Sequence, residues 1–209
     1  FDNQTEKFID VLSSVAESMI VNNYADHIYT LSKGISWITF QNECAAIRID
    51  DQLCKQGKGI TLYSSFKQNL KGDKIYTVFE DSEGDEWILT NKGISIIGKK
   101  QVDSDFPFQY IKEADGIIYL VSQSDKLASY NFKTRQFKFI EIPYHVSMIN
   151  EVKKFDSNTL LLATDNGLII YKIKEKEFQL IDIRTSTQPS NVVQSVYQDH
   201  YKELWIFPQ

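Results

Sequence analysis

The sequence predicts an all-β protein, and three observations carry that prediction. Ile, Val, Thr and aromatic residues make up 74 of the 209 residues, whereas Ala contributes only 7. Branched and aromatic side chains fit a pleated, half-buried sheet and lose rotamer freedom in helices. Glycine and polar turn signals interrupt the apolar stretches at short intervals. The same order of strands and turns also recurs along the chain, which indicates a repeat architecture.

The clearest repeat unit covers residues 75–94 and reads as strand, acidic turn, strand, glycine turn, strand. Asp81 and Gly84 suit the first turn, because Asp can bond backbone amides two residues on and Gly takes positive φ at little cost. In the second turn, Lys92-Gly93 predicts a two-residue hairpin in which both residues have positive φ. Trp87 and Trp205 are expected to point into the layer between neighbouring sheets, where a large flat side chain fills the wedge.

Three further copies follow the same pattern. Asn166-Gly167 repeats the glycine turn, and Asp199 precedes Trp205 by the six residues that separate Asp81 from Trp87. The unit at 115–122 has Tyr119 at the Trp position. The residues of the structural repeat motif are therefore Asp81, Gly84, Trp87, Thr90, Gly93, Thr164, Gly167, Asp199 and Trp205.

The first part of the chain is less regular. Ile28–Leu31 and Trp37–Phe40 align with the first two strands of the repeat if the acidic turn is shortened to Ser32-Lys33-Gly34. A competing register places residues 27–31 in the second strand. Residues 12–25 fit a short helix or an extra strand.

The Trp positions of five successive units are 50, 32, 42 and 44 residues apart, a mean of 42. A four-stranded propeller blade repeats about every 40–45 residues. We therefore expect β-propeller blades, four-stranded antiparallel sheets, about four of them full and two partial. The predicted single propeller fragment, residues 1–209, comprises the end of a blade at 1–12, blades at 26–66, 74–104, 106–142 and 148–183, and the start of a blade at 191–209. It is expected to be part of a larger propeller; the alternative is an imperfect fifth blade formed by the two ends.

The pattern Asp81-x-x-Gly84-x-x-Trp87-Ile88-x-Thr90-x-x-Gly93 resembles the propeller repeat of bacterial two-component regulators. The resemblance implies the extracytoplasmic sensor region of hybrid histidine kinases that regulate glycan use. Only the unit around Trp87 has the whole motif. Leu161 replaces the aromatic residue in one unit, and Ser122 and Pro208 replace the Thr in two others.

Composition and charge exclude several function classes. The chain has 42% hydrophobic and 24% charged residues, which is ordinary for a globular domain and argues against disorder. A net charge of −5 with interspersed signs argues against nucleic-acid binding, which needs clustered basic side chains. Neither a signal peptide nor a run of about 18 apolar residues is present in the sequence, so any export signal or anchor is expected outside it. Cys44 and Cys54 are too few for a disulfide scaffold or a zinc cage, and a bridge between them stays open.

The sequence predicts no catalytic residue, metal site or cofactor. His27, His145 and His200 lie in different repeats and in no zinc-type spacing. Sugar recognition needs aromatic faces and planar polar side chains on loops, and the segments between the outer strand of one repeat and the first strand of the next have this character. The candidate ligand-binding residues are Phe108, Tyr110, Tyr144, His145 and Asn191, each of which ordinary strand entry also explains.

The preferred hypothesis is a non-enzymatic, periplasmic sensor region of an inner-membrane protein. It would bind or respond to a small carbohydrate and signal to a membrane-spanning histidine kinase through a homodimer. The membrane would be contacted only through parts outside these residues. The alternatives are a generic propeller scaffold for protein partners and, third, a propeller hydrolase or lyase.

Overall fold

Strands dominate the computed structural model, in which residues 24–40, 45–56, 58–64, 70–98, 104–122, 124–131, 134 and 136–209 are described. The chain forms two compact units, residues 1–98 and 99–209. The helical elements within the described residues are a single turn, η2 (Ser32–Gly34), and the four-residue α1 (Asp51–Cys54). No helix in this described part is long and apolar enough to cross a bilayer. The all-β prediction is confirmed.

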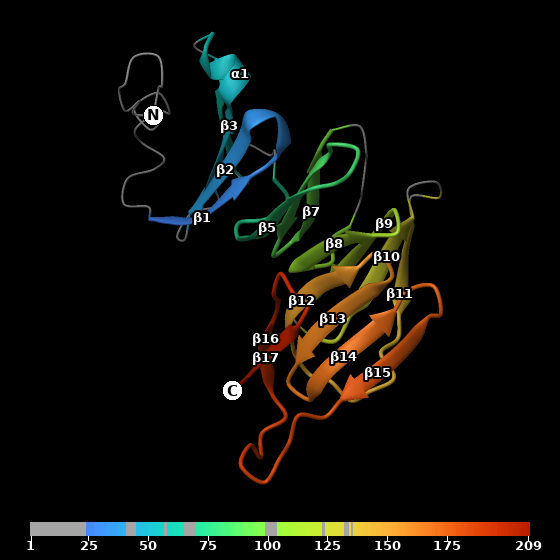
Figure 1. Ribbon diagram of the computed structural model, residues 1–209. Helices are drawn as coiled ribbons and strands as arrows, with labels where there is room; N and C mark the ends of the chain where they lie inside the picture. Colours follow the sequence, from blue (N-terminus) through green and yellow to red (C-terminus); the bar gives the residue numbers. More distant parts are fainter. Residues whose placement is uncertain are drawn as a thin grey trace. The chain divides into compact units, whose positions relative to one another are not determined.

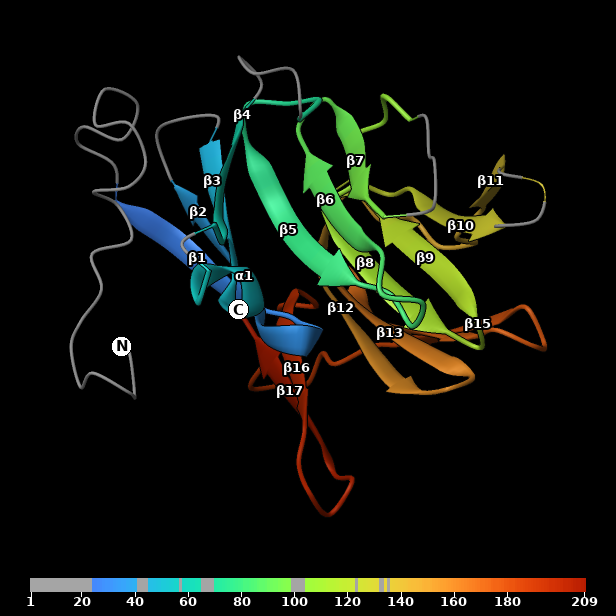
Figure 2. The ribbon, with the colours of Figure 1, turned by 90° about the horizontal axis from the view of Figure 1, so that it is seen from above.

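The first unit contains two antiparallel sheets with strands in sequence order. One sheet consists of β1 (Ala25–Thr30), β2 (Ile35–Phe40), β3 (Ala45–Asp50) and β4 (Ile60–Ser64), and α1 follows β3 (Figure 1). The other consists of β5 (Ile75–Glu80), β6 (Glu86–Thr90) and β7 (Gly93–Ile97), which lie side by side in Figure 2. Any fourth strand at 99–103 falls outside the described residues.

The register of the first sheet decides between the two alignments of the sequence. Tyr29 pairs with Trp37 across β1 and β2, as Phe79 pairs with Trp87 across β5 and β6. The shortened turn at residues 32–34 is therefore confirmed and the competing register is wrong. The expected blade end at 1–12 and the segment 12–23 lie outside the described residues. Cys54 is a free thiol. Cys44 lies outside the described residues.

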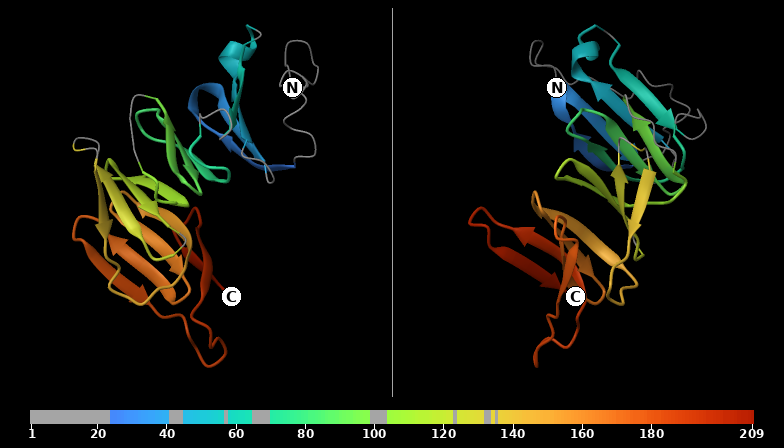
Figure 3. Two further views of the ribbon diagram at one scale, coloured as in Figure 1. Left: turned by 180° about the vertical axis from the view of Figure 1, so that it is seen from behind. Right: turned by 90° about the vertical axis from the view of Figure 1, so that its right-hand side faces the viewer.

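The second unit contains three antiparallel sheets. Their strands are β8 (Tyr110–Ala114), β9 (Ile117–Val121), β10 (Leu127–Asn131) and β11 (Gln136–Ile140); β12 (Ile149–Asp156), β13 (Thr159–Thr164), β14 (Gly167–Lys172) and β15 (Glu177–Ile181); and β16 (Val193–Gln198) with β17 (Leu204–Pro208). A long loop joins β15 to β16 and extends away from the sheets (Figure 3). These strands fall in the residue ranges expected for the blades.

Within each unit, one packing rule joins successive sheets. The side chain at the Trp position packs with aliphatic residues of the following sheet: Trp37 with Val78 and Ile88, Tyr119 with Val152 and Leu160, and Leu161 with Val196 and Ile206. This burial of a large apolar side chain in the layer between two sheets stabilises each joint. The rule explains why Leu161 can stand at a position occupied elsewhere by an aromatic residue.

The expectation for Trp205 is wrong, whereas that for Trp87 is confirmed. Trp87 is fully buried, but Trp205 is 54% exposed. Tyr197 and Phe207, on the same face of the β16–β17 hairpin, are also about half exposed. Within the described residues of the second unit, no further sheet packs on this face to form the wedge that Trp205 is expected to fill.

The acidic turn is built identically in two hairpins. Asp81 accepts hydrogen bonds from the amides of Glu83 and Asp85 and, at 2.8 Å, from the indole Nε1 of Trp87. Asp199 accepts the equivalent bonds from Tyr201, Glu203 and Trp205, the last at 3.1 Å. Gly84 has φ 86°, and Lys202 takes the same place with φ 67°. The motif therefore requires the carboxylate more strictly than the glycine.

The glycine turn differs from its prediction. Thr90 Oγ1 donates to the carbonyl of Gly93, and Thr164 Oγ1 donates to that of Gly167. Positive φ is confined to these glycines, at 128° and 100°, and Lys92 and Asn166 do not share it. Thr90 pairs with Gly93 and Thr164 with Gly167, so each hairpin loop has two residues but they precede the glycine. The prediction that Lys92-Gly93 and Asn166-Gly167 are the central pairs, with both φ positive, is thus wrong. At Gly167 a Cβ would also lie 2.5 Å from the carbonyl oxygen of Ile181.

Candidate functional site

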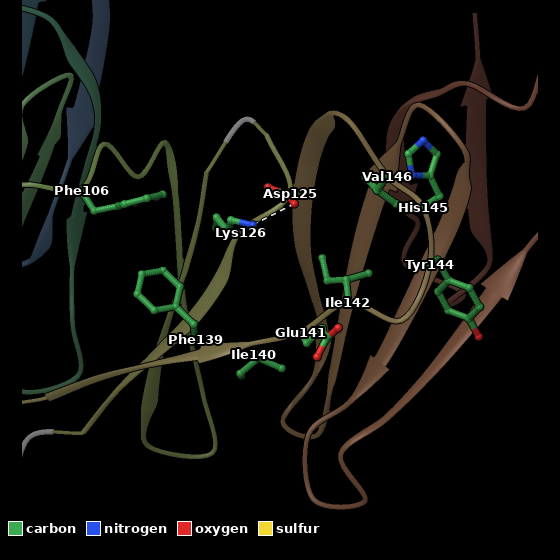
Figure 4. Close-up of a pocket in the computed structure, with 10 residues that line it drawn as sticks. All are labelled: Phe106, Asp125, Lys126, Phe139, Ile140, Glu141, Ile142, Tyr144, His145 and Val146. Atoms are coloured by element: carbon green, nitrogen blue, oxygen red, sulfur yellow. Dashed lines mark hydrogen bonds and ion pairs between the residues drawn. The ribbon is translucent and has the colours of Figure 1, made fainter.

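A pocket of about 580 Å³ opens in the second unit, beside the loop from β11 to β12 (Figure 4). Three segments form it: Phe106, which precedes β8; Asp125 and Lys126, which precede β10; and residues 139–146, which end β11 and continue into the loop. The volume is within the roughly 300–1,000 Å³ range of small-molecule sites. Two of the predicted ligand-binding residues, Tyr144 and His145, line this pocket.

One side of the pocket is aromatic. Phe106 and Phe139 meet edge to face with ring centroids 5.6 Å apart, and Phe139 is 54% exposed. Phe108 lies behind them, 4.7 Å from Phe106 and buried. Phe137 stacks on Phe108 at 5.9 Å, which continues the cluster along β11. The two outer rings offer a flat apolar surface to a ligand, since aromatic faces stack readily on planar or ring-shaped groups.

The polar groups of the pocket come from the turn before β10. Lys126 Nζ lies 3.0 Å from Asp125 Oδ2 (Figure 4). The hydrogen bond from Lys126 holds the pKa of the Asp125 carboxyl below its ordinary value of 3.8. Asp125 is therefore a carboxylate at neutral pH. Both side chains are about half exposed, so this ion pair is available to polar groups of a ligand.

The loop from β11 to β12 is tied down at both predicted residues. The hydroxyl of Tyr144 donates to the carbonyl of Phe178 at 3.1 Å, and the carbonyl of His145 accepts from Asn166 Nδ2 at 2.9 Å. The imidazole of His145 is left exposed, and in Figure 4 it diverges from the ring of Tyr144. The loop thus presents His145 from a fixed backbone.

The other three predicted residues lie apart from the pocket lining. Phe108 is buried behind Phe106. The hydroxyl of Tyr110 donates to the carbonyl of Asn150 at 2.6 Å, which joins β8 to β12, and burial raises its pKa. Asn191 accepts from the amide of Ile183 and donates to Asn166 Oδ1. Their binding role stays a prediction, and the polar atoms of Tyr110 and Asn191 already have partners within the chain.

Sequence reasoning missed Phe139 and the Asp125–Lys126 pair. A usable signal was the alternation of Phe137 and Phe139 in β11, which places two aromatic side chains on one face of an edge strand. The ion pair gave no such signal, because charged residues in turns are ordinarily solvated. Within the described residues, no group of His, Cys, Asp and Glu could hold a metal ion.

Solved structures similar to this chain share its sheet architecture. The extracellular domain of the one-component system BT4673 from B. thetaiotaomicron matches with a TM-score of 0.65 and 19% identity over 88% of this chain. The extracellular domain of the hybrid two-component system BT3049 from the same organism matches with a TM-score of 0.63 and 21% identity over 87%. The sheets are β-propeller blades.

A third propeller of different function is equally similar. Virginiamycin B lyase from Staphylococcus aureus matches with a TM-score of 0.64 and 18% identity over 86% of this chain. The chain spans 61% of the lyase, but only 26% and 25% of the BT4673 and BT3049 domains. No protein-family model and no curated protein matches the sequence. At these identities the comparisons show the fold alone.

Proposed function

We propose that this propeller belongs to the extracytoplasmic sensor region of a two-component signalling protein. The observation that carries the proposal is the agreement between the repeat motif around Trp87 and the likeness to the BT4673 and BT3049 extracellular domains. In this proposal the region lies in the periplasm and is carried by an inner-membrane histidine kinase that acts as a homodimer. A ligand shifts the dimer arrangement only if it binds the two states with different affinity.

The ligand proposed for the pocket is a small carbohydrate. Exposed Phe139 and half-buried Phe106 supply the stacking surface, and Lys126 with Asp125 supplies hydrogen-bonding groups for hydroxyls. The exposed imidazole of His145 adds a further polar group. Phe139 lies at the end of β11, and the other residues lie on connections between strands of rigid sheets, where binding residues are commonly found.

Calorimetry of the chain against a panel of oligosaccharides tests the carbohydrate proposal. A sugar that binds the wild-type chain should bind Phe139→Ala at least about tenfold more weakly, because the stacking surface is lost. Phe207→Ala, which removes a similarly exposed aromatic ring outside the pocket, should leave the affinity unchanged. If the folded parent ectodomain binds no sugar of the panel, the carbohydrate proposal is wrong.

The sensor proposal has a separate test. The parent reading frame should encode a membrane-spanning segment and a histidine kinase domain on the same polypeptide. Their absence would contradict the sensor role even if a sugar binds the pocket.

Two other functions have an observation in their favour. The exposed face of Tyr197, Trp205 and Phe207 favours a scaffold for protein partners, which predicts that Trp205→Ala abolishes capture of a partner by the folded chain. The likeness to virginiamycin B lyase favours an enzyme. If the chain turns over a substrate and His145→Ala abolishes that turnover, the protein is an enzyme and the proposal of a non-enzymatic sensor is wrong.

A further inference from the structure

A second cavity in the second unit is a groove of about 490 Å³ between the β8–β11 sheet and the β12–β15 sheet. Tyr119 and Ser129 line it from the first sheet, and Tyr171 faces them from β14. The groove and the pocket described above share only residues 139–141, at the end of β11. It is therefore a distinct space with its own walls.

The groove exists because this joint lacks a Trp. Tyr119 occupies the Trp position of its blade, and its neighbours in the same row are Ser129 on β10 and Lys138 on β11. The corresponding row of the first sheet carries Trp37 followed by Arg48. A phenol and a small hydroxyl fill less of the layer between two sheets than an indole and a guanidinium, so space remains here.

The hydroxyls of two largely buried Tyr side chains open onto this space. Tyr119 and Tyr171 are each only 3% exposed, and their ring centroids lie 6.2 Å apart. Neither hydroxyl makes a hydrogen bond to another described residue, whereas those of Tyr110 and Tyr144 both donate to carbonyls. Both hydroxyl oxygens are reached by solvent, since Asp73 Oδ1 is the one fully buried side-chain N or O atom without a partner among the described residues. The groove therefore presents two adjacent donors to a ligand.

The charges around the hydroxyls favour an anion. Lys138, Lys174 and Lys176 line the groove, against two carboxylates, Asp115 and Glu141. Lys174 lies 3.8 Å from Asp115, while Lys138 and Lys176 have no ion-pair partner among the residues described. Burial raises the pKa of both phenols, so each is a neutral hydrogen-bond donor across the physiological range. For Tyr119, the neighbouring phenol and Asp115 raise the pKa further.

The remaining lining is apolar. Ile117 and Ile173 contribute branched side chains, and Phe139 contributes part of an exposed ring at the shared end of β11. We propose that this groove binds a small organic carboxylate with a planar apolar body. Its carboxylate accepts hydrogen bonds from the hydroxyls of Tyr119 and Tyr171 near Lys138, and its body lies against the apolar lining. This site does not depend on the sensor role, and it shares Phe139 with the carbohydrate pocket.

Three probes separate the two halves of this ligand in a titration followed by two-dimensional NMR. Benzoate has both the carboxylate and the ring, benzyl alcohol lacks the charge, and acetate lacks the ring. Benzoate should perturb the backbone signals of β9, β10 and β14 and saturate, and it should bind at least about tenfold more tightly than either other probe. Equal binding of benzyl alcohol would overturn the proposal, as would equal binding of acetate or no binding of benzoate.

The hydroxyls provide matched variants. Tyr119→Phe and Tyr171→Phe should each weaken benzoate binding about tenfold, since a bond to a carboxylate is among the stronger kind. Tyr201→Phe, a phenol that is 75% exposed in the β16–β17 turn, should bind benzoate as the wild type does. Because the two groove hydroxyls have no partner in the chain, both Phe variants should unfold at the same or higher urea concentration. Full benzoate affinity in both variants would overturn the proposal.

Discussion

The hairpins β5–β6 and β16–β17 have the same local structure and opposite environments. In each, an Asp accepts two turn amides and the indole hydrogen of the Trp six residues later. Yet Trp87 is fully buried and Trp205 is 54% exposed. The turn and the Asp–Trp bond are thus determined by a short stretch of sequence. Burial of the Trp is therefore not determined by the hairpin alone.

In the β1–β2 hairpin, the Trp indole bonds a residue outside its own hairpin. Its shortened turn has no Asp six residues before Trp37, where Leu31 stands. The indole instead donates at 2.6 Å to Glu86 of the neighbouring β5–β7 sheet, and the Arg48 guanidinium makes a bidentate contact with the same carboxylate. The hydrogen bonds that Arg48 donates to Glu86 raise the pKa of the guanidinium. A contact made within one hairpin elsewhere is here made between two sheets.

The largest expected effect is at Trp87. Trp87→Ala should lower the free energy of unfolding by about 3–5 kcal/mol, because it removes a fully buried indole and leaves a cavity. Trp205→Ala should cost less than about 1 kcal/mol, as expected for a surface position. Urea unfolding of both variants measures the difference. Equal losses would break the comparison between the two hairpins.

The next effect is at Glu86, which is 4% exposed. Glu86→Ala should cost about 3 kcal/mol or more, since it leaves the guanidinium of Arg48 and the indole of Trp37 without their acceptor in a buried place. Glu86→Gln keeps an oxygen acceptor and should lose less. Thermal unfolding measures both variants. A loss in Glu86→Ala no larger than that in Trp205→Ala would show that the joint does not depend on this carboxylate.

A smaller effect is expected in the glycine turn. Thr164→Val should cost about 1–2 kcal/mol, because Thr164 is fully buried and its hydroxyl both donates to Gly167 and accepts from the amide of Asn166. Thr164→Ser keeps the hydroxyl and should lose less. Chemical denaturation of the pair measures this contribution. Equal stability of the Val and Ser variants would contradict a role for the hydroxyl.

The smallest effect is the pH dependence of the exposed hairpin. The hydrogen bond from the Trp205 indole, with those from the amides of Glu203 and Tyr201, lowers the pKa of Asp199 from 3.8 in the folded chain. A lowered folded-state pKa contributes stability above the unfolded value and loses it as pH falls through the folded value. The stability difference between wild type and Asp199→Asn should therefore be constant above about pH 5 and shrink below about pH 4. Urea titrations at a series of pH values measure it, and a difference that does not change with pH would contradict the indole bond.

The sequence was sufficient to predict features that neighbouring residues encode. Strand order and the acidic turns follow from alternation and turn chemistry within about 20 residues. The sequence left two registers open for the first sheet, and the pairing of Tyr29 with Trp37 decides between them. The backbone of the glycine turn was predicted incorrectly, because a side-chain bond from Thr90 to Gly93 selects a different turn. The short helix α1, capped by Asp50, interrupts a connection for which the repeat gives no precedent.

The candidate sites were predicted less well because they depend on contacts between sheets. Tyr110 and Asn191 have the right chemistry for binding, but their polar atoms bond segments distant in sequence. The groove at Tyr119 left a trace in the sequence, namely a Tyr at a position that holds Trp in other blades. The Tyr indicates a groove only once the structure places Tyr171 on the opposite sheet.

The most direct test of the account is the exposure of the three Trp side chains in the intact chain. With 5-fluorotryptophan incorporated, ¹⁹F NMR should show three resonances, and Trp205→Phe assigns one of them. A soluble gadolinium chelate should broaden the Trp205 resonance and leave those of Trp37 and Trp87 sharp, since Trp205 is 54% exposed and the other two side chains are fully buried. Equal protection of all three resonances would contradict the claim that the same hairpin structure leaves its Trp buried in one place and exposed in another.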